Sequence, residues 1–245
     1  MKKYLILILI AFLFCSFVIP NKINLWLCGD STMSVKETSA YPETGWGMPF
    51  VYFWDSSIQV KNLAKNGRST KTFITENRWQ NVIDSINEGD YVFIQFGHND
   101  EVPEKKDRYT TPEEYKKNLI KFVNETKQKK AMPILLTPVS RRKFDSLGNA
   151  ENTHFIYSNL VREVCKSENV FCIDLDQKSK ELFQEFGEEK SKLLFLQLKK
   201  NEHPNYPNGK IDNTHFNELG ARVVAEIVLA EIVKLKTSLT NHIIK

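Results

Sequence analysis

Five short apolar segments, each followed by a polar turn or a helical pattern, constrain the fold more than any other feature of this sequence. They span residues 23–28, 58–64, 91–96, 133–137 and 170–174. The third segment, Tyr91–Phe96, is apolar at nearly every position, as expected of a strand that helices cover on both faces. This alternation of strands and helices predicts an α/β fold, a three-layer α/β/α sandwich around a five-stranded parallel sheet.

Helix signals between the strands support this fold. The clearest is at Thr111, followed by Pro112 and Glu114, because these residues favour an N-cap, a first helical position and a capping box. Further helices are expected over about 152–166, 175–198 and 217–236. No repeat or Ser/Gly linker divides the sequence, so a single domain is expected after the N-terminal segment.

The N-terminal segment has the pattern of an export signal. Two lysines precede an apolar run from Tyr4 to Ile19 that is interrupted only by Ser16. We therefore expect residues 1–20 to be a signal peptide and residues 21–245 to form the domain, which would be secreted or periplasmic. Because no Ala-x-Ala cleavage site is visible, an uncleaved anchor and a lipid on Cys15 are the alternatives. The run is short for a membrane span, which favours cleavage.

The charge of the chain indicates no general macromolecular partner. Without Lys2 and Lys3 the formal net charge falls from +4 to +2. Such a small excess favours neither nucleic acid nor a membrane surface, so neither is expected as a partner. A membrane would be reached only through a retained or lipidated N-terminus.

Neither a disulfide framework nor a metal site is predicted. Three cysteines follow the apolar run, an odd number without the spacing of metal ligands: Cys28, Cys165 and Cys172. Four histidines fall in separate loops, again without paired spacing: His98, His154, His203 and His215. Cys28 and Cys172 lie in expected strands, where a small buried apolar side chain is the simpler interpretation.

A candidate nucleophile, Ser31, directly follows the first apolar segment. The sequence Gly29-Asp30-Ser31-Thr32 lies at the edge where open parallel sheets bind ligands. A serine hydroxyl becomes a nucleophile when an imidazole takes its proton and a carboxylate orients that imidazole. Asp30 is expected to support the loop by accepting backbone hydrogen bonds rather than to take part in the chemistry.

Asp212 and His215 could supply the carboxylate and the base from a turn before the last helix. The pair alone is weak evidence, because Glu151 and His154 repeat almost the same pattern. Position favours Asp212 and His215, since they end the long final loop, whereas Glu151 or Asn152 is expected to cap a helix. His154 stays an alternative base.

An ester hydrolase also needs donors for the oxyanion that forms at the carbonyl. The candidates are the backbone N–H groups of Ser31 and Gly67 and the side-chain amide of Asn99, which follow the first three strands. Taken singly, Gly67 and Asn99 could equally serve only to form turns.

Together these residues resemble the four sequence blocks of the SGNH or GDSL family of hydrolases. The blocks are Gly29-Asp30-Ser31, Asn62-x-Ala64-x-x-Gly67-Arg68, Gly97-His98-Asn99-Asp100 and Asp212-x-x-His215. Within that family the chain is most similar to rhamnogalacturonan acetylesterases. The segments that carry this similarity are 29–32, 44–47, 66–69, 95–100, 137–142 and 212–216.

The resemblance implies a flavodoxin-like sandwich and a serine esterase that removes O-acetyl groups from an acetylated polysaccharide, pectic rhamnogalacturonan, without a cofactor. Its implied site consists of a catalytic triad of Ser31, His215 and Asp212, an oxyanion hole of Ser31, Gly67 and Asn99, and substrate contacts from Arg68, His98 and Arg141. Binding of acidic galacturonate would explain the basic residues near the strand ends, Arg68, Arg141, Arg142 and Lys143, although a solvated basic loop explains them equally well.

Two alternative functions stay open. One is an acetylesterase that acts on xylan, sialate or another acetylated glycan. The other is a non-catalytic carbohydrate-binding module with a defunct site, which the complete set of predicted catalytic residues disfavours.

Overall fold

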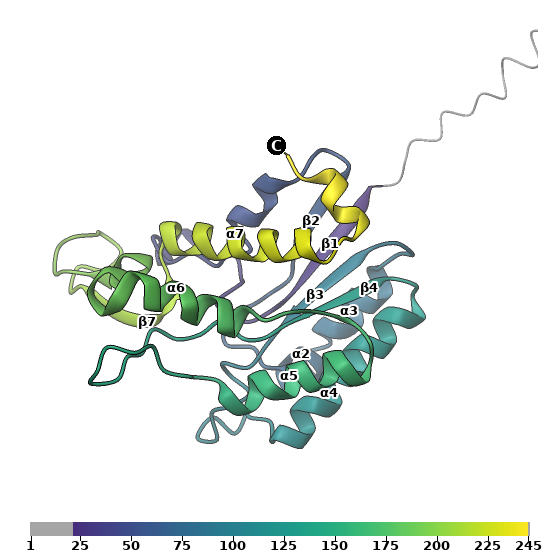
Figure 1. Ribbon diagram of the computed structural model, residues 1–245, viewed down its shortest axis with the longest axis horizontal. Coiled ribbons are helices and arrows are strands. Elements are labelled where there is room, and N and C mark those ends of the chain that lie inside the picture. The colour runs from purple at the N-terminus through teal and green to yellow at the C-terminus, as the bar shows by residue number, and fades with distance from the viewer. Residues whose placement is uncertain (1–21, 245) are drawn as a thin grey trace, which may run out of the picture.

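In the computed structural model, which describes residues 22–244, five strands form one parallel sheet in the order β2-β1-β3-β4-β5 (Figure 1). The strands are β1 (Ile23–Gly29), β2 (Ile58–Asn62), β3 (Tyr91–Gln95), β4 (Met132–Leu136) and β5 (Phe171–Ile173). The five predicted strands and their parallel arrangement are confirmed, and the order is that of flavodoxin-like sheets. The predicted signal peptide, residues 1–20, and the lipidation alternative at Cys15 lie outside the described residues.

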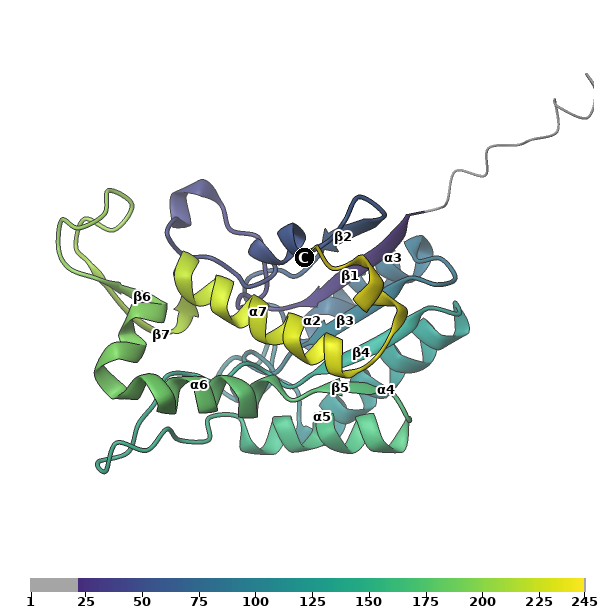
Figure 2. The ribbon, with the colours of Figure 1, turned by 45° about the horizontal axis from the view of Figure 1, so that its top comes forward.

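Helices cover both faces of this sheet (Figure 2). One face packs against α2 (Thr70–Thr75), α3 (Arg78–Ser85), α4 (Pro112–Gln128) and α5 (Phe155–Ser167). The other packs against α6 (Leu175–Lys190) and α7 (Glu218–Lys234), with the short helices η2 (Pro49–Phe53) and η3 (Ser191–Leu194). Two further short helices are η1 (Thr38–Ala40) and η4 (Ser238–His242). The three-layer α/β/α sandwich is therefore confirmed.

The alternation of side chains along β1 shows how a hydrophobic core forms on each face of the sheet. Leu25 and Leu27 are buried with α6 and α7, whereas Trp26 and Cys28 are buried with α2 to α5. Successive side chains of a strand point to opposite faces, so a strand that is apolar throughout supplies both cores. Each fully buried large side chain stabilises the fold by roughly 1.5–3 kcal/mol.

The helix cap predicted from the sequence is confirmed for α4 but not for α5. Thr111 and Glu114 form the predicted capping box. The expected cap of α5 at Glu151 or Asn152 is wrong, because α5 begins at Phe155 after His154, which makes no side-chain cap bond. The two expected caps instead pair with lysines, Glu151 with Lys143 and Asn152 with Lys180.

The predicted helix over residues 175–198 ends early. Gly187, with φ 70° and ψ 173°, interrupts it, and after η3 the chain forms β6 (Phe195–Leu198). β6 pairs antiparallel with β7 (Lys210–Phe216), so Asp212 and His215 lie in a strand rather than in a turn. A short apolar run such as Leu193–Leu196 suits a strand and a buried helix equally, which is why periodicity failed here.

The hairpin of β6 and β7 stands apart from the main sheet, beyond the carboxyl ends of its strands (Figure 2). No helix within residues 22–244 combines the length and the apolar character that crossing a membrane requires. Cys28, Cys165 and Cys172 all carry free thiols.

Candidate active site

Ser31 lies just beyond the carboxyl end of β1, where the chain turns out of the sheet. The order of the strands reverses here, since β2 and β3 pair with β1 on opposite sides. In open parallel sheets such a switch point is the usual place of ligand binding. The N–H groups of Met33 and Ser34 donate to the Asp30 carbonyl, so a tight turn presents the Ser31 side chain.

Ser31, His215 and Asp212 form a continuous chain of hydrogen bonds. The Ser31 hydroxyl lies 2.9 Å from His215 Nε2, and His215 Nδ1 lies 2.9 Å from Asp212 Oδ2. Because an ionised carboxylate can only accept, Nδ1 donates to it, and Nε2 accepts from the hydroxyl. This is the geometry that a nucleophile, a general base and an orienting carboxylate require.

The surroundings of Asp212 favour its ionised form. Partial burial opposes ionisation, but hydrogen bonds and charge from His215, with the Thr214 N–H, outweigh it, so the pKa of Asp212 lies well below its usual range. The N–H groups of Thr214 and His215 donate to Oδ1 at 2.8 and 2.9 Å. Oδ2 is therefore left for the imidazole.

Asp30 supports the turn before Ser31 from a fully buried position. Its Oδ1 accepts from the N–H and the hydroxyl of Thr32 at 2.9 and 2.8 Å, and its Oδ2 lies 3.2 Å from His98 Nδ1. Burial acts to raise the pKa of this carboxyl, yet His98 and Thr32 lower it to about 2. All these contacts are internal, as expected of a residue that supports the loop rather than the chemistry.

His98 is buried beside Asp30. Its side chain is 4% exposed, and its ring packs against the ring of His154 with 4.3 Å between the centroids. Burial lowers the pKa of His98 to about 4, so the ring is neutral at neutral pH. Pairing with the Asp30 carboxylate turns the imidazole inward, which disfavours contact with a substrate, and substrate binding by His98 stays a prediction.

His154, the alternative base, is buried as well. Its Nδ1 lies 2.9 Å from Glu101 Oε2, and within residues 22–244 its Nε2 has no hydrogen-bond partner. A general base must be within hydrogen-bond reach of the proton that it takes. His215 meets this condition at Ser31 and His154 does not, so the geometry favours His215.

The predicted oxyanion donors lie on loops next to the Ser31 turn. Gly67 has a φ of 75°, a conformation that glycine adopts without strain. The side-chain amide of Asn99 donates to the Arg68 carbonyl at 2.9 Å, which joins the loops after β2 and β3. That amide carries a second N–H, which is able to donate to an oxyanion. The role of these donors stays a prediction.

Lys36 ties two of these loops together, although nothing in its sequence context singles it out. Its side chain is 2% exposed, and its ammonium donates to the Ser31 carbonyl at 2.5 Å and to Asn66 Oδ1 at 2.8 Å. Glu43 supplies the opposite charge at 2.7 Å. Burial lowers the pKa of Lys36, and the Glu43 carboxylate opposes that shift. Lys36 therefore links the nucleophile turn to the residue before Gly67.

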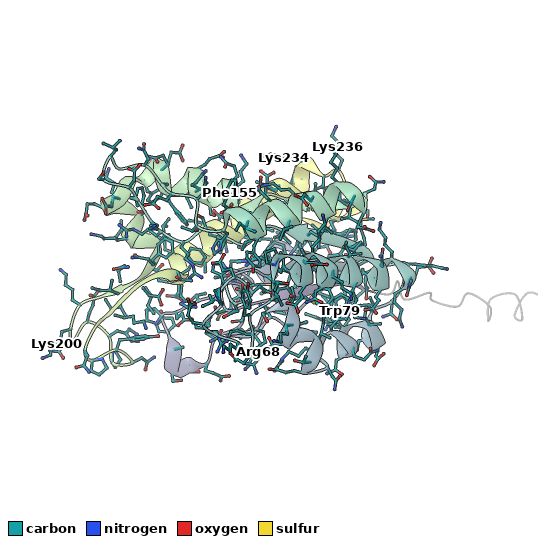
Figure 3. All side chains as sticks on the ribbon, turned by 90° about the horizontal axis from the view of Figure 1, so that it is seen from below. Arg68, Trp79, Phe155, Lys200, Lys234 and Lys236 are labelled. Carbon is teal, nitrogen blue, oxygen red and sulfur yellow. The ribbon has the colours of Figure 1, made fainter. Side chains whose placement is uncertain are left out.

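Arg68 and Arg141 both keep part of their side chains exposed. The Arg68 guanidinium lies 3.0 Å from Glu76 and 3.0 Å from the Asn66 carbonyl, and Figure 3 shows it on the outside of the molecule. Contact with a substrate is compatible with that position and stays a prediction. Arg141 instead contacts protein groups on three sides.

Among residues 22–244, no group of three or more His, Cys, Asp or Glu side chains is arranged to hold a metal ion. A cavity of about 630 Å³ lies at the amino ends of β3 and β4, where Tyr91, Met132 and Phe171 contribute to its lining. Its lining includes none of the predicted site residues, so it lies apart from the Ser31 centre.

A Ser-His-Asp hydrogen-bond chain at the carboxyl edge of a doubly wound sheet places this site in the serine-hydrolase class. The chain belongs to the GDSL-like Lipase/Acylhydrolase family, whose model matches residues 25–228. That match spans the main sheet except the first two residues of β1, and it includes all loops that carry the predicted site residues. The resemblance drawn from the four sequence blocks is thus confirmed.

Two Bacillus subtilis proteins are similar to nearly the whole chain. The rhamnogalacturonan acetylesterase RhgT is 40% identical over 227 residues, which cover 93% of this chain and 97% of the relative. The probable rhamnogalacturonan acetylesterase YesY is 37% identical, covering 91% and 98%. The crystal structure of YxiM from the same organism matches with a TM-score of 0.76 at 24% identity, over 89% of this chain and 58% of that one, which supports the fold alone.

Proposed function

We propose that this chain is a carbohydrate acetylesterase that removes O-acetyl groups from pectic rhamnogalacturonan. The observation that carries the proposal is the hydrogen-bond chain from Ser31 through His215 to Asp212, with 2.9 Å at each link. Membership of the GDSL-like family supports the class, a carboxylic ester hydrolase. The two similar proteins that bear this activity in their names support the substrate.

The reaction begins with acetyl transfer to the enzyme. His215 Nε2 takes the hydroxyl proton of Ser31 while Oγ bonds to the acetyl carbonyl carbon. The tetrahedral intermediate then breaks its bond to the sugar oxygen, which leaves with the proton from His215. Asp212 stabilises the imidazolium between these two transfers and holds the ring in place.

Water then regenerates the enzyme. His215 takes a proton from a water molecule whose oxygen attacks the carbonyl of acetyl-Ser31. The second tetrahedral intermediate breaks its bond to Ser31 Oγ, which regains a proton from His215 as acetic acid leaves and releases its own proton to solvent to become acetate. Every proton transfer runs through one imidazole, so this route uses no cofactor.

Negative charge on the carbonyl oxygen is stabilised by the N–H groups of Ser31 and Gly67 and the amide of Asn99. Each such donor typically contributes about 3 to 4 kcal/mol in the transition state. The bonds from Lys36 to the Ser31 carbonyl and to Asn66 help to hold two of these donors in place.

Acetate release from a set of substrates tests the assignment. We expect the wild-type enzyme to cleave p-nitrophenyl acetate and to release acetate from acetylated rhamnogalacturonan with a higher kcat/KM than from acetylated xylan. A higher value for xylan or a sialate ester would assign the enzyme to that glycan. Turnover of none of these esters would contradict an esterase and favour a carbohydrate-binding module.

We also propose that the protein is secreted or periplasmic. The charged and apolar pattern of residues 1–20, which lie outside the described residues, supports export. N-terminal sequencing of the protein from medium or periplasm is expected to begin near residue 21. An intact N-terminus in the membrane fraction, or a lipid on Cys15, would show an anchor instead, and recovery from the cytoplasm would contradict export.

A further inference from the structure

We propose that Arg141 and Arg142 are positioning residues that hold the strand carrying Asp212 and His215 against the rest of the site. This inference rests on the proposed function of that site. Asn213 and Thr214 lie between the two triad residues, and each accepts a hydrogen bond from one of the arginines. We call this pair the arginine clamp.

Arg141 joins β7 to the loop after β3. Its Nη1 donates to Thr214 Oγ1 at 2.8 Å. Its Nη2 lies 3.3 Å from the His98 carbonyl and 3.4 Å from Glu101 Oε1. His98 and Glu101 flank the oxyanion candidate Asn99 in sequence. One guanidinium therefore spans the segment with the general base and the segment with an oxyanion donor.

Arg142 holds the neighbouring residue of β7 from a buried position. Its backbone N–H donates to the Asn213 carbonyl at 2.8 Å, and its Nη1 donates to Asn213 Oδ1 at 3.0 Å. Its remaining donors contact Ser191 Oγ at 3.0 Å and the Glu188 carbonyl. The side chain thus connects β7 to the end of α6 and to η3.

The topology explains why such a clamp matters. β7 belongs to the separate two-stranded sheet, so no ladder of backbone hydrogen bonds joins it to the main sheet that carries Ser31. The clamp extends from the loop after β4, a central strand, where the Ser140 N–H donates to the buried Ser179 hydroxyl at 2.8 Å. Misplacing a reacting group by about 1 Å can lower the rate about a hundredfold. Single backbone hydrogen bonds do reach β7, from the Arg142 N–H to the Asn213 carbonyl and from the Thr44 N–H to the Phe216 carbonyl. The clamp adds side-chain links to these isolated bonds.

This role differs from the substrate contact predicted for Arg141. A guanidinium that bound galacturonate would matter only for polymeric substrates. A positioning residue would matter equally for p-nitrophenyl acetate, which has no sugar. The two roles are therefore distinguished by which substrates an Arg141 variant fails to hydrolyse. Loss with the polymer alone indicates substrate binding, whereas loss with p-nitrophenyl acetate as well indicates positioning.

The test compares Arg141→Met with the control variant Arg78→Met. The Arg78 side chain is 32% exposed, close to the 30% of Arg141, and it also pairs with a carboxylate. We expect Arg141→Met to lower kcat for p-nitrophenyl acetate about tenfold to a hundredfold with little change in KM, and to lower acetate release from acetylated rhamnogalacturonan by the same factor. Arg78→Met should leave both activities within about twofold of wild type.

A double-mutant cycle identifies the route of the effect. Thr214→Val removes the hydroxyl that accepts from Arg141. If Arg141 acts through β7, Thr214→Val alone lowers kcat, and the double variant is less impaired than the product of the two single effects. This single variant also tests the clamp if Arg141→Met fails to fold, which thermal unfolding would reveal.

Three outcomes would overturn the clamp. They are full activity of Arg141→Met on p-nitrophenyl acetate with loss confined to the polymer, independent effects in the cycle, and wild-type kcat for Thr214→Val. Because the small ester is the main readout, failure of the enzyme to act on rhamnogalacturonan would contradict the proposed substrate without contradicting the clamp.

Discussion

Two buried carboxyl groups beside the nucleophile turn differ in how completely they are hydrogen-bonded. Asp30 has partners at both oxygens, Thr32 at Oδ1 and the His98 ring at Oδ2. Asp100, also fully buried, accepts at Oδ1 from the N–H and the hydroxyl of Thr70 at 2.9 and 2.5 Å and from the Thr110 hydroxyl at 3.0 Å. Within residues 22–244 its Oδ2 has no partner. Burial therefore dominates and raises the pKa of Asp100 to about 7, against the effect of these hydrogen bonds.

Asp100 should make stability fall as pH rises. Its pKa is higher in the folded state than in the unfolded state, so its contribution is complete below about pH 4 and is lost as pH rises through about 7. Asp100→Asn keeps an accepting oxygen and removes the ionisation. In urea unfolding we expect the stability of the variant relative to wild type to rise by roughly 2–4 kcal/mol between pH 4.5 and 8.5. Parallel pH curves would contradict this account.

At the scale of single residues, Arg141 and Arg142 also show that the sequence alone does not decide what a basic side chain contacts. A basic loop near the strand ends is compatible with an acidic substrate, with solvent and with internal hydrogen bonds. Only the position of β7 reveals that Arg141 and Arg142 contact Thr214 and Asn213. Lys36 is a similar case, because its contact with the Ser31 carbonyl depends on a turn that no spacing rule predicts.

At the scale of elements, the hairpin of β6 and β7, which carries Asp212 and His215, is the part of the fold that the sequence did not predict. Side chains three residues apart in a regular strand point to opposite faces. Asp212 and His215 nevertheless meet, and Asp212 Oδ1 accepts from the N–H groups of Thr214 and His215. The ladder between the two strands is also irregular between Phe195 and Gln197.

The strands of the main sheet and the helices α4 and α5 show which parts of the fold could be predicted from the sequence. Strands that are buried on both faces have nearly continuous apolar runs, so all five strands of the main sheet were found within a few residues of their ends. The cap of α4 was found because its residues form a local motif. The start of α5 was missed because Glu151 pairs with Lys143 and Asn152 with Lys180. These contacts are not local in sequence and form only in the folded chain.

At the scale of the whole molecule, the strand order brings the loops after β1, β2 and β3 to one edge, where Ser31, Gly67 and Asn99 follow their strands. Each of these residues could be selected from the sequence because each comes directly after an apolar run. For the partner of Ser31, position in the sequence favoured His215 and left His154 as an alternative, since the choice depends on which loop folds over the edge. The structure brings His215 to Ser31 and buries His154 beside Glu101.

Turnover of p-nitrophenyl acetate by Ser31→Ala, His215→Ala and His154→Gln, each checked by thermal unfolding, tests the central claim most directly. We expect the first two variants to lose at least about a thousandfold in kcat while remaining folded, because the nucleophile or its base is gone. His154→Gln should keep more than about a tenth of the wild-type rate, since His154 makes no contact with Ser31. Near-normal turnover by Ser31→Ala, or a loss found only with the His154 variant, would contradict the claim.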